Sequence, residues 1–198
     1  MNLLVDVVPY NIKIGKTEYK IRTDFRIWIM FEQLLLDESI DDSAKSQLAF
    51  NMIFCDEKPC ESEETIEEII KFYRCNKSEN KYNRSEKHTS DIQYIYDYDI
   101  DDEYIYSAFL QQYNINLQTD NLHWWEFKAL FKSLSDSCKI VEIMGYRAIE
   151  IESVPKSQRP FYRKMKKIYA LPLSADEIQK NNLIEDALLQ GKSIKNLL

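Results

Sequence analysis

The chain has 198 residues, 44% of them hydrophobic and 13% aromatic, which suits about one domain and a fraction with a real core. Its charged residues leave no apolar run near the roughly 20 residues that a membrane-spanning helix needs, and residues 1–10 lack the basic cluster of a secretory signal. A net charge of −7 and a pI near 5.0 argue against a dedicated nucleic-acid binder. These values predict an acidic, soluble, intracellular protein.

Residues that bind phosphates or metals through short motifs are scarce. The three glycines, Gly15, Gly145 and Gly191, are far apart, so the glycine-rich loops of Walker and Rossmann proteins are absent from the sequence. The four cysteines form no C-x-x-C pair, and His88 and His123 are distant from them in sequence. A zinc site needs about four converging ligands, so we expect reduced thiols and no metal or cofactor.

Residues 7–22 are predicted to form a β-hairpin, because apolar and polar residues alternate on both sides of a two-residue turn at Gly15-Lys16. An isolated hairpin is marginal, so its apolar face must pack on a helix. Thr23 is the expected N-cap of a helix over 25–36. Trp28 and Phe31 lie at helical spacing in it and are predicted to be buried.

Two more helices are expected before residue 75, one beginning at 41–43 and one capped near Ser62. The buried stripe of the latter is predicted to be Ile66, Ile69, Ile70 and Tyr73. Residues 76–92 are almost wholly polar and are predicted to be a mobile loop or linker. This divides the chain into 1–75, the linker, and a helical part over 93–198 that we expect to form one compact unit with the first.

The second part is predicted to be helical over 101–113, over a segment capped by Asp120 or Asn121, from Ser135 to Gly145, over 160–171, and over 174–190. The apolar residues expected to face the core are Phe127 and Phe131, then Phe161, Met165 and Ile168. The predicted fold class is therefore mainly α (α+β), with an N-terminal β-hairpin packed on a multi-helix bundle.

Two groups of residues have side chains of the kind found in catalytic or metal sites. Five acidic residues lie between Asp97 and Glu103. A calcium-binding EF-hand loop needs glycine at its sixth position and glutamate at its twelfth. Counted from Asp97, these positions hold Asp102 and Ala108, so the EF-hand pattern is not met. Acidic residues at a helix N-terminus explain them better. His123 has no motif beside it that supplies a nucleophile, so a structural histidine near a helix start is favoured over a general base. We therefore expect no catalytic residue and no enzyme activity.

Two features are candidate partner-binding sites. Trp124 and Trp125 point about 100° apart on a helix, so one is expected in the core and the other at an edge, where it would contact a partner. The segment after residue 158 is basic and contains aromatic residues, which would suit nucleic acid. Its aromatics have core spacing, however, so a solvated face or an acidic protein partner is favoured. The candidate partner-binding residues are Trp124, Trp125, Arg163, Lys164, Lys166 and Lys167.

Several short motifs together resemble one family. They are DFR at 24–26 with Trp28 and Phe31-Glu32, FYRC at 72–75, DEYIYSAFLQQY at 102–113, LHWWEFKAL at 122–130, MGYR at 144–147, and FYRKMK at 161–166 followed by YALP at 169–172. They resemble the gene-product-fifteen family of tailed phages and prophages of Gram-positive bacteria, over about residues 10–172. The segment 76–90 and the chain after Pro172 carry no matching motif.

The resemblance implies a small cytoplasmic phage morphogenesis protein, a tail assembly chaperone. Such a protein binds the long, aggregation-prone tape measure protein, and works with other tail assembly proteins, before the tail tube polymerises; it is absent from the mature virion. The family has no catalytic residues to carry over. Two alternatives stay open: a phage regulatory protein that binds a host protein or nucleic acid through the basic helix, and a minor structural tail component. Self-association is also open; a membrane partner is not expected.

Overall fold

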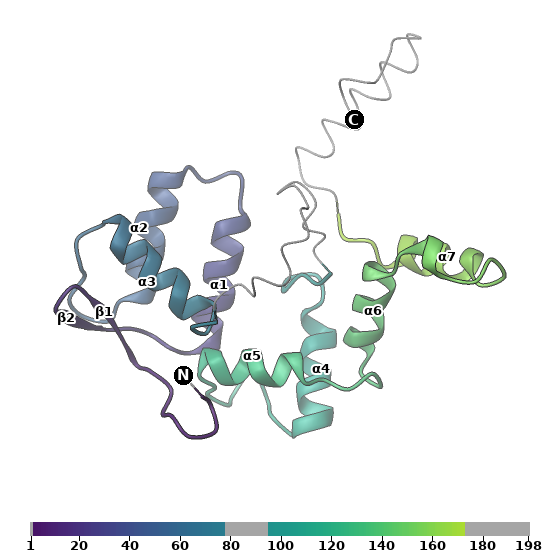
Figure 1. Ribbon diagram of the computed structural model, residues 1–198, viewed down its shortest axis with the longest axis horizontal. Coiled ribbons are helices and arrows are strands. Elements are labelled where there is room, and N and C mark those ends of the chain that lie inside the picture. Colours follow the sequence, from purple (N-terminus) through teal and green to yellow (C-terminus); the bar gives the residue numbers. More distant parts are fainter. Residues whose placement is uncertain (1, 78–94, 173–198) are drawn as a thin grey trace, which may run out of the picture. The chain divides into compact units, whose positions relative to one another are not determined.

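The structure is a computed structural model that describes residues 2–77 and 95–172 (Figure 1). Within these residues the chain forms seven α-helices and one two-stranded antiparallel sheet at its N-terminal end, which confirms the predicted fold class. The residues group into two compact units, unit 1 with 2–77 and 101–142, and unit 2 with 95–100 and 143–172. Apart from residues 76 and 77, the expected linker lies outside the described residues, as does the helix expected over 174–190.

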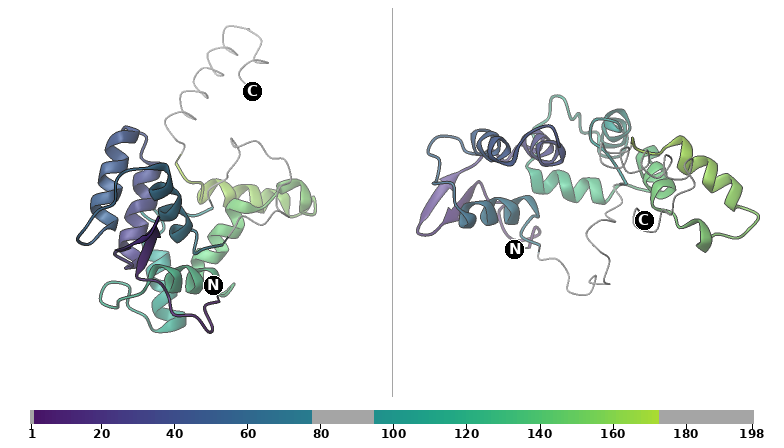
Figure 2. Two further views of the ribbon diagram at one scale, coloured as in Figure 1. Left: turned by 60° about the vertical axis from the view of Figure 1, so that its left-hand side comes forward. Right: turned by 90° about the horizontal axis from the view of Figure 1, so that it is seen from above.

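The hairpin forms as expected. Strands β1 (Asn11–Ile14) and β2 (Thr17–Lys20) pair antiparallel, and Gly15 takes a φ of +58° in the turn between them, a conformation that glycine adopts without steric cost. β1 packs on α3 (Glu63–Tyr73) (Figure 2). The Gly15 N–H also donates to Glu64 Oε1 at 3.0 Å, so a backbone bond fixes the turn to this helix.

The helices of the first part begin close to the expected residues. They are α1 (Phe25–Leu36), α2 (Asp42–Ile53) and α3. Ser62 caps α3 as predicted, but the prediction of Thr23 as the cap of α1 is wrong. Asp24 is the cap, and its side chain accepts from Arg26 N at 2.9 Å. Thr23 has a different role, because its carbonyl oxygen accepts from Trp124 N at 2.7 Å.

The buried stripe of α3 differs from the predicted one. Thr65, Ile69 and Phe72 are buried, whereas Ile66 is 44% exposed. The Phe72 ring packs 4.7 Å from that of Trp28, which is fully buried as predicted. The helix is therefore turned towards the aromatic side chains of its neighbours, and apolar spacing within α3 alone could not reveal that direction.

Four more helices follow: α4 (Asp102–Tyr113), α5 (Trp124–Lys132), α6 (Lys139–Ala148) and α7 (Arg159–Ile168), with a 3₁₀ turn at Ile151–Ser153. Gly145 does not end α6 as predicted. Its carbonyl oxygen accepts from Ile149 N at 3.1 Å, so the helix continues past it. Space is open around a Cβ placed at Gly145, and a glycine is not required there by packing.

Aromatic rings from α1, α4 and α5 form the core of unit 1. Phe127 stacks on Phe25 at 4.8 Å and on Phe109 at 5.0 Å between ring centroids. Phe31, Phe127 and Phe131 are buried, as the helical spacing predicted. Stacked aromatic pairs contribute about 0.5–1.5 kcal/mol each beyond the area they bury, so these contacts fix how the three helices pack.

Candidate partner-binding surfaces

Trp124 and Trp125 are both buried, with exposed fractions of 0% and 2%, so the expectation that one of them lies at an exposed edge is wrong. Each indole N–H finds a backbone acceptor at the end of α3: Trp124 donates to Tyr73 O at 2.9 Å and Trp125 to Phe72 O at 2.8 Å. Two adjacent carbonyl oxygens of α3 thus accept the hydrogen bonds of two indole groups that point in different directions. Neither tryptophan is available as an exposed partner contact in this structure.

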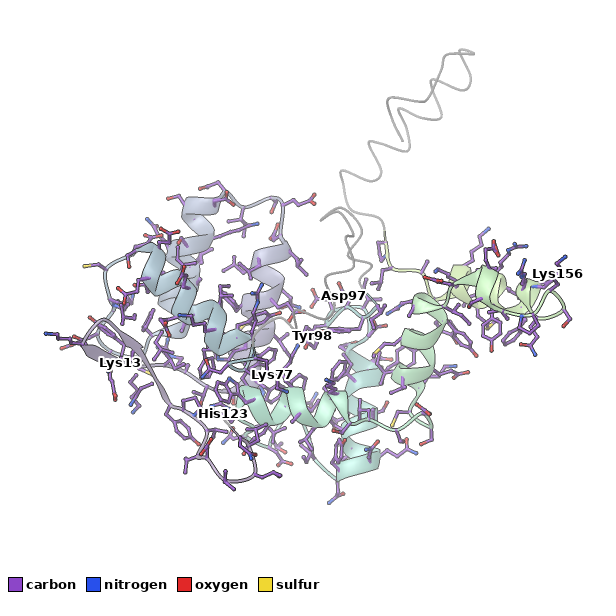
Figure 3. All side chains as sticks on the ribbon, viewed as in Figure 1. Lys13, Lys77, Asp97, Tyr98, His123 and Lys156 are labelled. Atoms are coloured by element: carbon purple, nitrogen blue, oxygen red, sulfur yellow. The ribbon has the colours of Figure 1, made fainter. Side chains whose placement is uncertain are left out.

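His123 is the N-cap of α5, in place of the predicted Asp120 or Asn121 (Figure 3). The Trp125 N–H donates to its Nδ1 at 3.1 Å, so the ring proton is on Nε2, which donates to Pro9 O at 2.9 Å. Burial lowers the pKa of His123, while the bond to Pro9 and the charge of Glu126 act in the opposite direction. The neutral ring thus joins the N-terminal arm to the start of α5, as a structural histidine does.

Two arginines of the other motifs also serve the fold. Arg26 pairs with Asp24 at 2.9 Å and donates to Leu117 O at 2.6 Å and Asp120 O at 2.9 Å, which fixes the loop before α5. Arg147 of unit 2 donates to Ile95 O and Tyr169 O. The motifs at 24–26 and 144–147 therefore specify packing.

Helix α7 is the one α-helix among the described residues that buries no side chain. None of its residues is buried; Phe161 is 51% exposed and Ile168 is 56% exposed. The prediction that Phe161, Met165 and Ile168 form a core stripe is therefore wrong. The spacing of the three residues is as predicted, but the stripe is covered only in part within the described residues: Met165 is half-buried, and Phe161 and Ile168 remain about half exposed. Side chains project from several sides of α7, and Lys156 marks the loop before it (Figure 3).

One side of α7 is held within unit 2. Tyr146 of α6 stacks on Tyr169 at 5.8 Å and contacts the rings of Phe161 and Tyr162, each at 6.2 Å. Lys166 Nζ donates to Ile149 O at 3.1 Å. These contacts set the rotation of the helix about its own axis.

The cations of α7 fall into two groups. Arg159 is used locally, because its guanidinium donates to Val154 O at 2.9 Å and to Glu152 O at 2.8 Å, and Lys166 bonds as above. Arg163, Lys164 and Lys167 are exposed and make no hydrogen bond or ion pair with the described residues. Of the six candidate residues, these three remain available to a partner.

The N-terminal arm offers a second exposed apolar segment that the sequence analysis missed. Leu4, Val5 and Val7 are 92%, 78% and 85% exposed. In the sequence these residues belong to an apolar cluster over 3–8, and the hairpin predicted over 7–22 begins only at Asn11 in the structure. Only part of this arm is fixed, through Pro9 and the edge of Tyr10, whose ring lies 5.5 Å from that of His123.

The acidic residues near 97–103 also have a local role. Asp97 Oδ1 accepts from the backbone N–H groups of Asp99 and Ile100, and Asp102 lies in the first turn of α4. In residues 2–77 and 95–172, no three His, Cys, Asp or Glu side chains converge as metal ligands would. Across the same residues, no helix combines the length and apolar character that spanning a membrane requires.

The fold is thus that of a small, mainly α protein with an N-terminal hairpin. A family model described as bacteriophage Gp15 protein matches residues 4–171, which is most of the chain. The chain therefore belongs to the bacteriophage Gp15 family and is a phage-related protein. Comparisons with curated proteins and with solved structures gave no match.

Proposed function

We propose that this chain is a non-enzymatic tail assembly chaperone, which binds the tape measure protein in the cytoplasm of the host during tail assembly. On this proposal it needs no cofactor and is absent from the mature virion. Membership of the bacteriophage Gp15 family places the chain among phage proteins; the assignment to tail assembly rests on resemblance and on the surface properties of the chain.

The observation that carries the proposal is the exposed apolar side of α7. Phe161 and Ile168 are each about half exposed on a helix that buries no residue. A chaperone for a long, aggregation-prone client needs apolar side chains that accept many similar segments, because burial of apolar surface is the main driving force for such contacts. Leu4, Val5 and Val7 of the arm form a second, separate exposed apolar segment, in unit 1.

The competing regulatory function is favoured by one observation, the five cations of α7. Nucleic acid attracts such a helix through its phosphates. Against it stand the net charge of −7 and the local use of Arg159 and Lys166 by backbone carbonyls. A regulator would bind DNA with an affinity that falls steeply with salt, whereas apolar contacts with a client are not screened.

The test is co-expression of the full chain with the tape measure protein of the same phage, with the tape measure protein expressed alone as the control. We expect the chain to raise the soluble fraction of the client and to copurify with it. The complex should persist in roughly 1 M salt, where the Debye length is only about 3 Å. No client recovered at low or raised salt, together with salt-sensitive retention of DNA, would overturn the proposal in favour of the regulator.

A second measurement separates the chaperone from a minor tail component. Purified virions are analysed by quantitative mass spectrometry, with the tail tube protein as the internal reference. The chaperone proposal expects no stoichiometric amount of this chain in the particle. A fixed copy number per virion would establish the structural role instead.

A further inference from the structure

The side chains of α7 are ordered around its axis in a way that separates the cations from one another. At 100° per residue, Phe161, Met165 and Ile168 fall within about 60° of each other and form one stripe. Tyr162 and Tyr169 lie about 80–100° to one side of Phe161, where both contact Tyr146. Tyr146 also contacts the ring of Phe161, at 6.2 Å, so the contact that holds the helix in unit 2 reaches that edge of the stripe.

Two exposed lysines lie on the other side of the stripe. Lys164 is about 60° from Phe161 and Lys167 is about 120° from it, whereas Arg163 is about 160° away, on the back of the helix. Lys164 and Lys167 make no hydrogen bond or ion pair with the described residues, and α7 contains no carboxylate of its own. The stripe, in which Phe161 and Ile168 are about half exposed and Met165 is half-buried, therefore has a cationic flank on the side away from Tyr146.

We infer that this surface docks an amphipathic helical segment of the client whose apolar face is bordered by carboxylates. The surface consists of the stripe of Phe161, Met165 and Ile168 and of the flank formed by Lys164 and Lys167. The inference rests on the proposed function and names the kind of client segment that is recognised. An amphipathic helix presents side chains at i, i+3, i+4 and i+7, which is the spacing that the stripe itself has.

The expected charge of the client segment follows from the absence of carboxylates in α7. Burying the stripe brings the client helix beside Lys164 and Lys167, and these ammonium groups need opposite charges there or remain facing water. A basic client segment would meet like charge, so the flank selects acidic segments against basic ones. Phosphates of nucleic acid would use every exposed cation, including Arg163, since their attraction is not restricted to one side of the helix.

The experiment uses the full-length chain and an array of overlapping synthetic peptides that cover the tape measure protein of the same phage. We expect the retained peptides to be those with an apolar helical stripe and net negative charge. Their affinities for the chain and its variants are then measured by fluorescence anisotropy, with circular dichroism as the check that each variant is folded.

Matched pairs of variants separate the stripe and its flank from general surface effects. Ile168→Ser is expected to weaken peptide binding at least tenfold, and Leu48→Ser, at a side chain of α2 that is 47% exposed, less than twofold. Lys164→Glu is expected to weaken binding about fivefold or more, whereas Arg163→Glu makes the same charge change on the back of the helix and should cost less than twofold. A peptide with its carboxylates replaced by lysines should regain affinity for Lys164→Glu.

Each contrary outcome has a definite meaning. Equal losses for Lys164→Glu and Arg163→Glu, or DNA retained more strongly than any peptide, would overturn the inference in favour of non-directional charge binding. A dimer that dissociates on Ile168→Ser would show that a second copy covers the stripe. Strong hydrogen-exchange protection of α7 in the free chain, unchanged by peptide, would show that the chain covers the stripe itself. If the variants bind the whole tape measure protein normally, docking at α7 fails but the chaperone function stands; if the unaltered chain does not bind it, the proposed function fails first.

Discussion

Phe127 lies at the centre of the aromatic core, and its truncation tests how unit 1 is held together. The side chain is fully buried, and four rings surround it: Phe25 at 4.8 Å, Phe109 at 5.0 Å, Trp124 at 5.9 Å and Phe131 at 6.0 Å between centroids. These rings come from three helices, so the cavity left by Phe127→Ala can close only if packed helices shift.

The expected cost of Phe127→Ala is about 4 kcal/mol, within the range of about 3–5 kcal/mol for removing a buried phenylalanine ring. With a urea dependence of about 2 kcal/mol per molar, the unfolding midpoint should fall by about 2 M. The assay is tryptophan fluorescence in urea. All three tryptophans, Trp28, Trp124 and Trp125, lie in unit 1, so the signal reports this unit alone.

The control is Leu48→Ala, also in unit 1, where the side chain is 47% exposed. It should cost no more than about 0.5 kcal/mol and move the midpoint by at most about 0.3 M. A midpoint for Phe127→Ala equal to that of the parent, with an unchanged urea slope, would mean that α5 does not turn this face to α1 and α4, and the packing described here would be wrong.

Two further outcomes follow from the start of α5. Burial lowers the pKa of His123 in the folded chain below its ordinary 6.5. Between the folded pKa and 6.5 the unfolded chain therefore binds more protons than the folded chain. The contribution of His123 to the free energy of unfolding is complete above pH 6.5 and is lost as pH falls through the folded pKa. Urea midpoints at several pH values should show this loss for the parent. His123→Asn keeps a capping side chain that does not titrate, so its midpoints should lack the loss. Identical pH profiles for the two proteins would count against the neutral cap. Trp125→Phe removes the donor to Phe72 O and is expected to cost about 1–2 kcal/mol, measured from the fluorescence of Trp28 and Trp124; a cost near zero would show that this hydrogen bond does not help to fix α5 to α3.

The local sequence determined the elements of the fold, because their signals act over a few residues. The turn at Gly15-Lys16 depends on the freedom of one glycine, and the cap at Ser62 on one side-chain hydrogen bond. The buried positions of Phe127 and Phe131 followed from helical spacing within α5. The same spacing failed in α7, since a stripe shows which residues share a face and does not show whether another element covers that face.

The choice among equally suitable local signals was made by tertiary contacts. Asp120, Asn121 and His123 were all able to cap α5; His123 does so because Pro9, more than a hundred residues earlier in the chain, fixes the other side of its ring. The burial of both tryptophans was decided in the same way, by Tyr73 O and Phe72 O at the end of α3. The sequence alone thus indicated a family and a set of elements. Only the folded chain shows that Trp124 and Trp125 lie in the core and that α7 lies at the surface. Burial depends on contacts between residues that are distant in sequence.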